Sequence, residues 1–322
     1  MVETNAELLV DRLKTISRTR HLCFEEGTQS AWLYEVLSPH VDETVVTVKQ
    51  ERRGANKDDA RDALELADKL RTNSLKVRVY KEVGRYGRLR ELTKVHGMQV
   101  RDSVRLQNRI LSLYRSRGID TNDSLYHPDH RAEWIGKLPA RMQTAAESLL
   151  RQYDAVEPLR RETEKTMVKE ARKQPEAKLL ATVPGLGAIR VAYLMSIIVS
   201  PHRFRTREQI WQYAGLGVVM RSSSDWVQGG DGKWRKDQVQ QTRGLTRHHN
   251  HELKAIFKGA ATTVIGQAHK DCPLHRHYER MLENKTKPNL AKLTLARQIA
   301  AITLSIWKKE VAFDAAKLNK PS

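Results

Sequence analysis

Cysteine is nearly absent from this 322-residue sequence, which contains only Cys23 and Cys272, far apart along the chain. Two isolated cysteines support neither a disulfide framework nor a cysteine-based zinc site, and they indicate a reducing compartment. No segment approaches the roughly 20 apolar residues that a membrane-spanning helix requires. The N-terminus has no basic stretch followed by an apolar run, so no signal peptide is predicted. We therefore expect a cytoplasmic protein that does not enter a membrane.

Acidic residues are scarce relative to basic ones, with 38 Asp and Glu against 57 Lys and Arg and a formal net charge of +19. A soluble protein this basic most often binds a polyanion, because each phosphate that it neutralises releases a condensed counterion. A generically basic protein is the alternative. Apolar residues make up 39%, enough to bury cores. The length suits two domains of roughly 100–200 residues each.

Short apolar strands alternate with helices in the first 80 residues. Strands are predicted at 21–25, 45–48 and 75–80, and helices at 1–18, 31–37 and 58–70. The run at 45–48 is β-branched and apolar, which is typical of a buried strand. The alternating order implies an α/β unit with a parallel sheet.

Two long helices are predicted next, at 88–117 and at about 140–173. The apolar spacing in the first varies between three and five residues, so it resembles a coiled coil without a strict heptad. Pro158 is expected to break or bend the second, because proline removes a backbone donor. The pair would form either a spacer or dimerisation arm, or a helical hairpin packed on its own chain.

The third part begins with a glycine turn between two apolar helices, Pro184-Gly185-Leu186-Gly187. This pattern resembles a helix-hairpin-helix, in which glycines let the backbone approach a phosphate and the second helix offers free N–H groups. An ordinary tight turn is the alternative. A two-stranded ribbon is predicted around Gly229 to Gly232. Helices are predicted after it, at 249–266, 272–284 and 289–310.

Basic side chains gather beside the glycine turn and around the ribbon, which favours contact with a nucleic-acid backbone. The predicted nucleic-acid-binding residues are Gly185, Gly187, Arg203, Arg205, Arg221, Lys233, Arg235, Lys236, Arg243 and Arg247. Three histidines, His248, His249 and His251, follow them. Because their spacing fits no zinc pattern, phosphate contact or polarity at a helix start is the preferred interpretation.

Carboxylates and serines are the candidate catalytic groups. Glu25 ends a predicted strand, and Asp59 and Asp62 lie three apart on the first turn of a predicted helix. Such acids can converge on Mg²⁺, although acids at a helix start also simply favour the helix dipole. The run Ser222-Ser223-Ser224 offers a hydroxyl that could attack a phosphodiester, although serines in turns are usually only turn formers.

Six motifs spread over nearly the whole chain carry a family resemblance. They are Phe24 to Gln29, Asn56 to Ala63, Pro201 to Thr206, Tyr213 to Gly217, Arg243 to His251 and Leu293 to Arg297. As a set they resemble the insertion-sequence transposases of the IS-one-ten type, the bridge-RNA-guided recombinases related to Piv-type DNA invertases.

The resemblance implies a fold of the α/β plus α class in three parts. Residues 1–87 would form an RNase-H/RuvC-like domain with an Asp-Glu-Asp-Asp metal site, and 88–175 a coiled-coil-like helical region. Residues 176–322 would form a mainly helical serine transposase domain with a helix-hairpin-helix. The partners implied are DNA, a structured non-coding guide RNA and further copies of the chain, as a dimer or tetramer.

The resemblance also assigns site residues by motif position. The ligands of Mg²⁺ would be Glu25, Asp59 and Asp62, and the nucleophile would be Ser223. Glu26 is the alternative to Glu25, and Ser222 the alternative to Ser223.

One part of the family pattern has no match. The family's first aspartate lies on a strand near its N-terminus, whereas this sequence begins with a predicted helix in which Asp11 is a poor substitute. We therefore expect an N-terminally truncated RuvC-like domain. The predicted function is RNA-guided strand cleavage and exchange by an insertion-sequence transposase. The alternative is a catalytically impaired remnant that still binds DNA and RNA.

Overall fold

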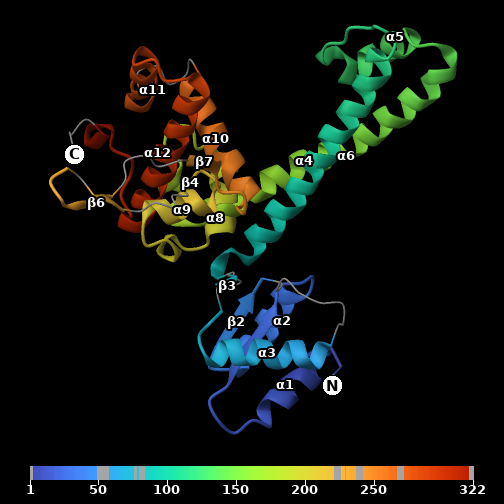
Figure 1. Cartoon of the computed structure of the whole chain (residues 1–322). Helices are drawn as coiled ribbons and strands as arrows, with labels where there is room; N and C mark the ends of the chain where they lie inside the picture. The colour runs from blue at the N-terminus through green and yellow to red at the C-terminus, as the bar shows by residue number, and fades with distance from the viewer. Residues whose placement is uncertain are drawn as a thin grey trace. The chain divides into compact units, whose positions relative to one another are not determined.

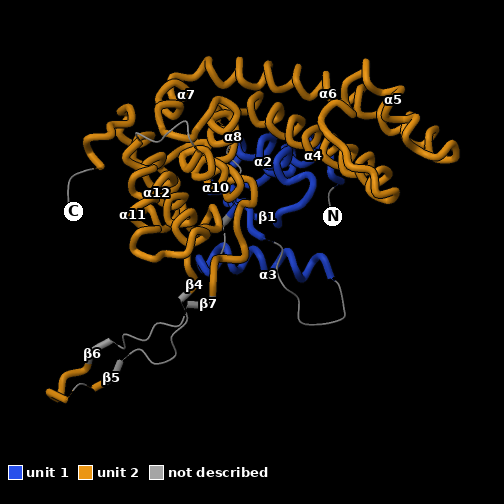
Figure 2. The backbone as a smooth tube through the Cα atoms, turned by 90° about the horizontal axis from the view of Figure 1, so that it is seen from above, with its two compact units in different colours: residues 1–83 blue, residues 84–322 orange. Residues whose placement is uncertain are grey.

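The computed structural model describes residues 3–48, 58–75, 78–79, 84–220, 226–228, 230–236, 242–266 and 272–318. The chain divides into two compact units, residues 1–83 and 84–322 (Figure 2). The predicted boundary between residues 87 and 88 lies close to this division. The boundary predicted between 175 and 176 has no counterpart in it, because both flanking regions belong to the second unit. No described helix is both long enough and apolar enough to cross a membrane.

In its described residues, the first unit contains a small sheet and three α-helices. Its elements are α1 (Ala6–Lys14), β1 (His21–Glu25), α2 (Ser30–Leu37), a 3-10 turn at Ser38–His40, β2 (Glu43–Thr47), α3 (Asp59–Arg71) and β3 (Arg78–Val79). The first helix begins later than predicted, because the Asn5 side chain accepts a hydrogen bond from the Glu7 backbone N–H, at 2.9 Å, and so caps it.

β2 is the central strand of the three, in the order β1-β2-β3. Its consecutive residues Val45 and Val46 are both buried, as predicted, whereas Val48, the last residue of the predicted strand, lies beyond β2 and is exposed. β1 pairs with β2 in parallel, as predicted, with Glu25 opposite Thr47. β3 pairs with β2 antiparallel, so the prediction of a wholly parallel sheet is wrong. Alternating side chains identify a strand and its faces, but the pattern is the same in either chain direction.

The second unit begins with a long helical hairpin. It consists of the turn Gly84–Tyr86, α4 (Gly87–Arg115), 3-10 turns at Asp123–Tyr126 and Pro128–His130, α5 (Arg131–Gly136) and α6 (Ala140–Arg172). α4 and α6 pack on each other along the hairpin, and α5 lies at its far end (Figure 1). That end has its own core, in which Ile110, Tyr114 and Leu150 are fully or almost fully buried. The helices therefore form a hairpin packed on its own chain.

Pro158 does not break α6, which continues through it to Arg172. Proline inside a helix removes one hydrogen bond and crowds the preceding turn. Of the two predicted outcomes, a break or a bend, the break is absent, and α6 packs on α4.

Helices dominate the remainder of the second unit. They are α7 (Pro175–Leu180), α8 (Ala188–Ile198), the 3-10 turn Pro201–Arg203, α9 (Arg207–Tyr213), α10 (His251–Ile265), α11 (Pro273–Glu283), α12 (Pro288–Lys309) and the 3-10 turn Ala315–Leu318. The last three α-helices confirm the predictions to within two residues. α12 buries an apolar stripe from Ala296 to Trp307, whereas Leu290, in its first turn, is exposed.

One core joins the base of the hairpin to these helices. Leu89 of α4 and Met167 and Ala171 of α6 are buried in the same cluster as Leu194 of α8 and Phe257 of α10. This shared core explains why residues 88–175 do not separate from the rest. A small sheet in one unit and a mainly helical second unit agree with the predicted α/β plus α class.

Two short antiparallel ribbons interrupt the helices. β5 (Trp226–Gln228) pairs with β6 (Trp234–Lys236), which confirms the predicted ribbon. β4 (Val218–Met220) pairs with β7 (Thr242–Leu245), and this outer pair was not predicted.

Candidate functional site

The predicted nucleophile Ser223 lies outside the described residues, as do Arg221 and Ser222. The strands that flank this segment are described. β4 ends at Met220 and β7 begins at Thr242, and these two residues are paired across the antiparallel ribbon. The two described ends of the excursion that contains the serine segment, Met220 and Thr242, therefore lie side by side.

Hydrogen bonds from three separate elements close the base of this ribbon. The backbone N–H of Thr246 donates to the Gly217 carbonyl at 3.0 Å. The backbone N–H of Asn250, which caps α10, donates to the Tyr213 carbonyl at 2.8 Å. From α12, the Arg297 guanidinium Nε donates to the Leu216 carbonyl at 2.6 Å. The turn after α9 is therefore hydrogen-bonded to the residue that follows β7, to the start of α10 and to α12.

Arg297 is also held through its backbone. The indole N–H of Trp211 donates to the Arg297 carbonyl at 2.8 Å, so Arg297 links α12 both to α9 and to the turn that follows it. Burial lowers the pKa of the Arg297 guanidinium. Sequence reasoning did not single out this residue, although it ends the motif Leu293 to Arg297, and that position was the available signal.

The turn at Gly215 is occupied on its inner side by a histidine. Gly215 has φ +65°, and a Cβ placed there would lie 2.4 Å from the imidazole ring of His249. His249 also stacks near His251, the first residue of α10, with ring centroids 4.4 Å apart. His249 therefore packs on the turn and His251 starts a helix, which agrees with a helix-start role better than with a metal site.

Replacing Gly215 with alanine is expected to destabilise the protein by about 1–3 kcal/mol, because the new Cβ overlaps the His249 ring at a positive φ. Thermal unfolding of the whole chain measures the effect. Gly136→Ala is the matched control, since a Cβ there meets no atom within 4 Å. Equal melting temperatures for the two variants would contradict the close packing.

The predicted phosphate-binding glycines differ in their surroundings. Gly185 is buried at φ +83°, and a Cβ there would lie 2.4 Å from the Ala260 carbonyl oxygen of α10. Its backbone thus approaches another helix, as in a tight packing turn. Gly187 is exposed and forms the N-cap of α8. Arg190, which sequence reasoning missed, secures the turn by donating to the Gly185 carbonyl at 2.7 Å and to Thr263 Oγ1 at 3.0 Å.

The predicted basic residues also divide into internal and exposed groups. Arg203 donates to the carbonyls of Ile197 and Ile198 at 3.0 and 2.9 Å, so its guanidinium binds the C-terminal end of α8. Arg205, Lys233 and Arg247 are exposed. The backbones of Arg235 and Lys236 lie on β6 and that of Arg243 on β7, and their side chains lie outside the described part.

The predicted acidic residues lie on neighbouring elements of the first unit. Glu25 is the last residue of β1, and Asp59 and Asp62 occupy the first turn of α3, which contacts β1. Asp58 caps that helix, with its Oδ1 3.1 Å from the Ala60 backbone N–H. Asp11 lies on α1, where it pairs with Lys14 at 3.4 Å. Among the described residues, no three or more His, Cys, Asp or Glu side chains are grouped so as to hold a metal ion.

Comparison with known families bears on the second unit. Residues 177–278 match the family model described as Transposase IS116/IS110/IS902 family. The match spans the glycine turn, α8, both ribbons and α10, and it supports a DNA-processing enzyme. Within that class it supports an insertion-sequence transposase of the IS110 type. No curated protein matches this chain.

Proposed function

We propose that this protein is an RNA-guided DNA transposase that cleaves and exchanges strands with Ser223 as its nucleophile. The observation that carries the proposal is the family match over residues 177–278, because this range includes the serine segment. The hydrogen-bonded base of the β4–β7 ribbon supports it, since a nucleophile must be presented from a fixed support. The serine hydroxyl would lose its proton, bond to a backbone phosphorus and release one deoxyribose hydroxyl.

The nucleic-acid partners of this proposal are DNA and a structured guide RNA, bound by an oligomer of the chain. The formal net charge of +19 supports a polyanionic partner, and the exposed Arg205, Lys233 and Arg247 are available to phosphates. We propose that α7, α8 and the turn between them form a helix-hairpin-helix, which would contact a DNA phosphate near the exposed Gly187. The oligomer rests on the family resemblance.

We further propose that the first unit is RuvC-like and that Glu25, Asp59 and Asp62 bind Mg²⁺. Carboxylate oxygens are the donors that Mg²⁺ takes in proteins, and the contact between α3 and β1 brings their elements together. Among the described residues, no three such side chains are grouped around one metal position. When bound, Mg²⁺ would stabilise negative charge on the attacking and leaving oxygens.

Incubation of the purified chain with the element's RNA and its end DNA in Mg²⁺ tests the proposed function. We expect strand cleavage together with a protein–DNA adduct that survives denaturation. Binding that weakens with salt but yields neither product would support the catalytically impaired remnant instead and overturn the proposed activity.

A further inference from the structure

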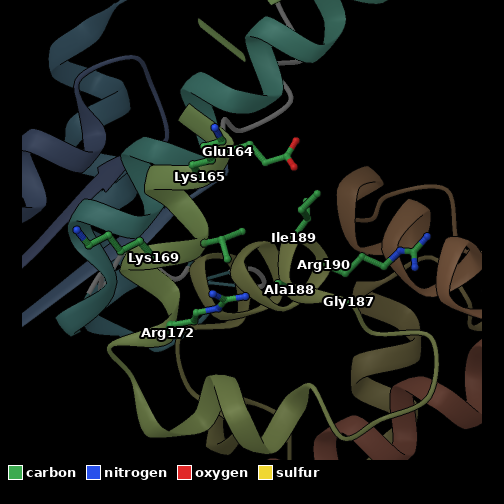
Figure 3. Close-up of a pocket in the computed structure, with 9 residues that line it drawn as sticks. Glu164, Lys165, Lys169, Arg172, Gly187, Ala188, Ile189 and Arg190 are labelled. Carbon is green, nitrogen blue, oxygen red and sulfur yellow. The ribbon is translucent and has the colours of Figure 1, made fainter. Parts of the chain in front are cut away.

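A cavity of about 850 Å³ opens where the C-terminal end of α6 passes the start of α8 (Figure 3). Met167 and Ala171 of α6 are buried in the shared core, which fixes the rotation of the helix at this point. The side chains of α6 that line the cavity therefore lie on a defined face. Of all the residues that line the cavity, only Gly187 was assigned a role from the sequence.

Three cations of α6 line this cavity, Lys165, Lys169 and Arg172. They are spaced by four and three residues, which places them on one side of a helix. All three are exposed, and within the described part of the chain none of them forms an ion pair. Two nearby basic residues are paired instead: Arg160 of α6 with Glu157 at 2.7 Å, and Lys173, which follows the last residue of α6, with Glu170 at 2.6 Å. The three charges at the cavity are therefore available to an anion.

The one acidic residue among those that line the cavity, Glu164, already has an Arg160 guanidinium as its partner. Glu164 Oε2 accepts a hydrogen bond from Arg160 Nη1 at 2.9 Å. The same oxygen lies 3.4 Å from Nε2 of the buried His96. Arg160 is shared between Glu164 and Glu157, but the three cations outnumber the single carboxylate at the cavity, so the cavity remains positively charged.

The opposite wall of the cavity is the N-terminal turn of α8. Gly187, Ala188, Ile189 and Arg190 line it. No side chain caps this helix, and its first turn contains no acidic residue. The first N–H groups of a helix have no intrahelical acceptor, and the helix dipole adds partial positive charge there. This wall adds to the positive potential that the α6 cations create.

We propose that this cavity binds the sugar–phosphate backbone of duplex DNA, with Lys165, Lys169 and Arg172 contacting phosphates; the proposal rests on the proposed transposase function. The α6 cations extend over roughly 10 Å of helix, at 1.5 Å per residue. That length spans several phosphates of one strand, at about 3.4 Å of duplex axis each, so the row of charges suits a polymer better than a single ion.

A matched pair of double variants tests the site. Lys165→Gln with Lys169→Gln removes two cavity charges, whereas Arg141→Gln with Arg151→Gln removes two exposed charges elsewhere on α6. Duplex affinity is measured by titration between 50 and 200 mM salt. We expect the cavity variant to lower the slope of log affinity against log salt by about 1.8, because each phosphate that the protein no longer neutralises lowers it by about 0.9. The control pair is expected to keep the wild-type slope.

A second variant separates binding from folding. Ile189→Glu places a carboxylate in the first turn of α8, where it favours the helix dipole and so preserves or raises the melting temperature. The same charge repels a phosphate in the cavity. We expect duplex affinity to fall by about 10-fold at 0.1 M salt, the effect of roughly one phosphate contact. Ile189→Gln is the neutral control and is expected to bind within about twofold of the wild type.

The outcomes distinguish the site from the proposed function. Equal slopes for the two double variants, in a protein that still forms adducts, would overturn the cavity site alone. A loss confined to RNA affinity would assign the cavity to the guide RNA and overturn its assignment to DNA. Wild-type protein that binds no duplex would overturn both the site and the function.

Discussion

Replacing Ser223 with alanine is expected to abolish the covalent protein–DNA adduct. The change removes only the hydroxyl oxygen, the atom that would bond to phosphorus, so no alternative nucleophile is left at that position. Non-covalent DNA binding is expected to stay within about twofold of the wild type, because a neutral serine adds little to an affinity dominated by phosphate contacts. Denaturing gel electrophoresis of labelled DNA, with matched RNA and Mg²⁺, measures the adduct.

The neighbouring serines are the controls for this experiment. Ser222→Ala and Ser224→Ala make the same chemical change on either side of Ser223, within the same segment between β4 and β7. We expect both to form adducts. Adducts at the wild-type level with Ser223→Ala would reject the nucleophile, and a loss confined to Ser222→Ala would move it by one residue.

Removing the carboxylates of the first unit is the second change with a large expected effect. Glu25→Gln and Asp59→Asn keep the size of each side chain but remove its charge. Loss of even an outer partner of a metal ligand costs about 10–100-fold in affinity or activity, so loss of a ligand is expected to cost at least that much. Cleavage rates measured against Mg²⁺ concentration should show both a lower maximum and a higher Mg²⁺ requirement.

Asp58 provides the control for the acidic residues. It lies beside Asp59, and its side chain caps α3 through the backbone N–H groups of Ala60 and Arg61. Asparagine caps a helix about as well as aspartate, so Asp58→Asn should leave both α3 and cleavage unchanged. If Asp59 and Asp62 merely favour the helix dipole, Asp59→Asn would lower stability by some tenths of a kcal/mol without affecting cleavage, and the metal assignment would be wrong. Full cleavage in a chelator would reject it as well.

Local patterns predicted most of the helices and strands. Apolar spacing placed α4, α6 and α12 to within about two residues of their observed ends, because a helix must bury one continuous stripe. The same patterns predicted β1, β2 and the β5–β6 ribbon. They did not predict the antiparallel direction of β3 or the continuity of α6 through Pro158. Both depend on the element that packs alongside, which the local pattern does not contain.

In the candidate site, too, the sequence determined some properties and the tertiary structure decided the others. The sequence by itself determined that the protein is strongly basic, that a glycine turn precedes α8 and that the serine run lies between two basic stretches. Tertiary structure decided what each residue does. Gly185 packs on α10 and Arg203 binds the end of α8, whereas Gly187 remains on the surface.

The unpaired cations of α6 show the physical reason for this difference. A lysine in a helix has the same sequence pattern whether a carboxylate neutralises it or a cavity leaves its charge available. Lys169 and Lys173 lie four residues apart, yet only Lys173 pairs with Glu170, while Lys169 lines the cavity at the start of α8 without an ion pair in the described part of the chain (Figure 3). Periodicity depends on neighbours along the chain, whereas burial, pairing and charge depend on partners brought together from distant positions.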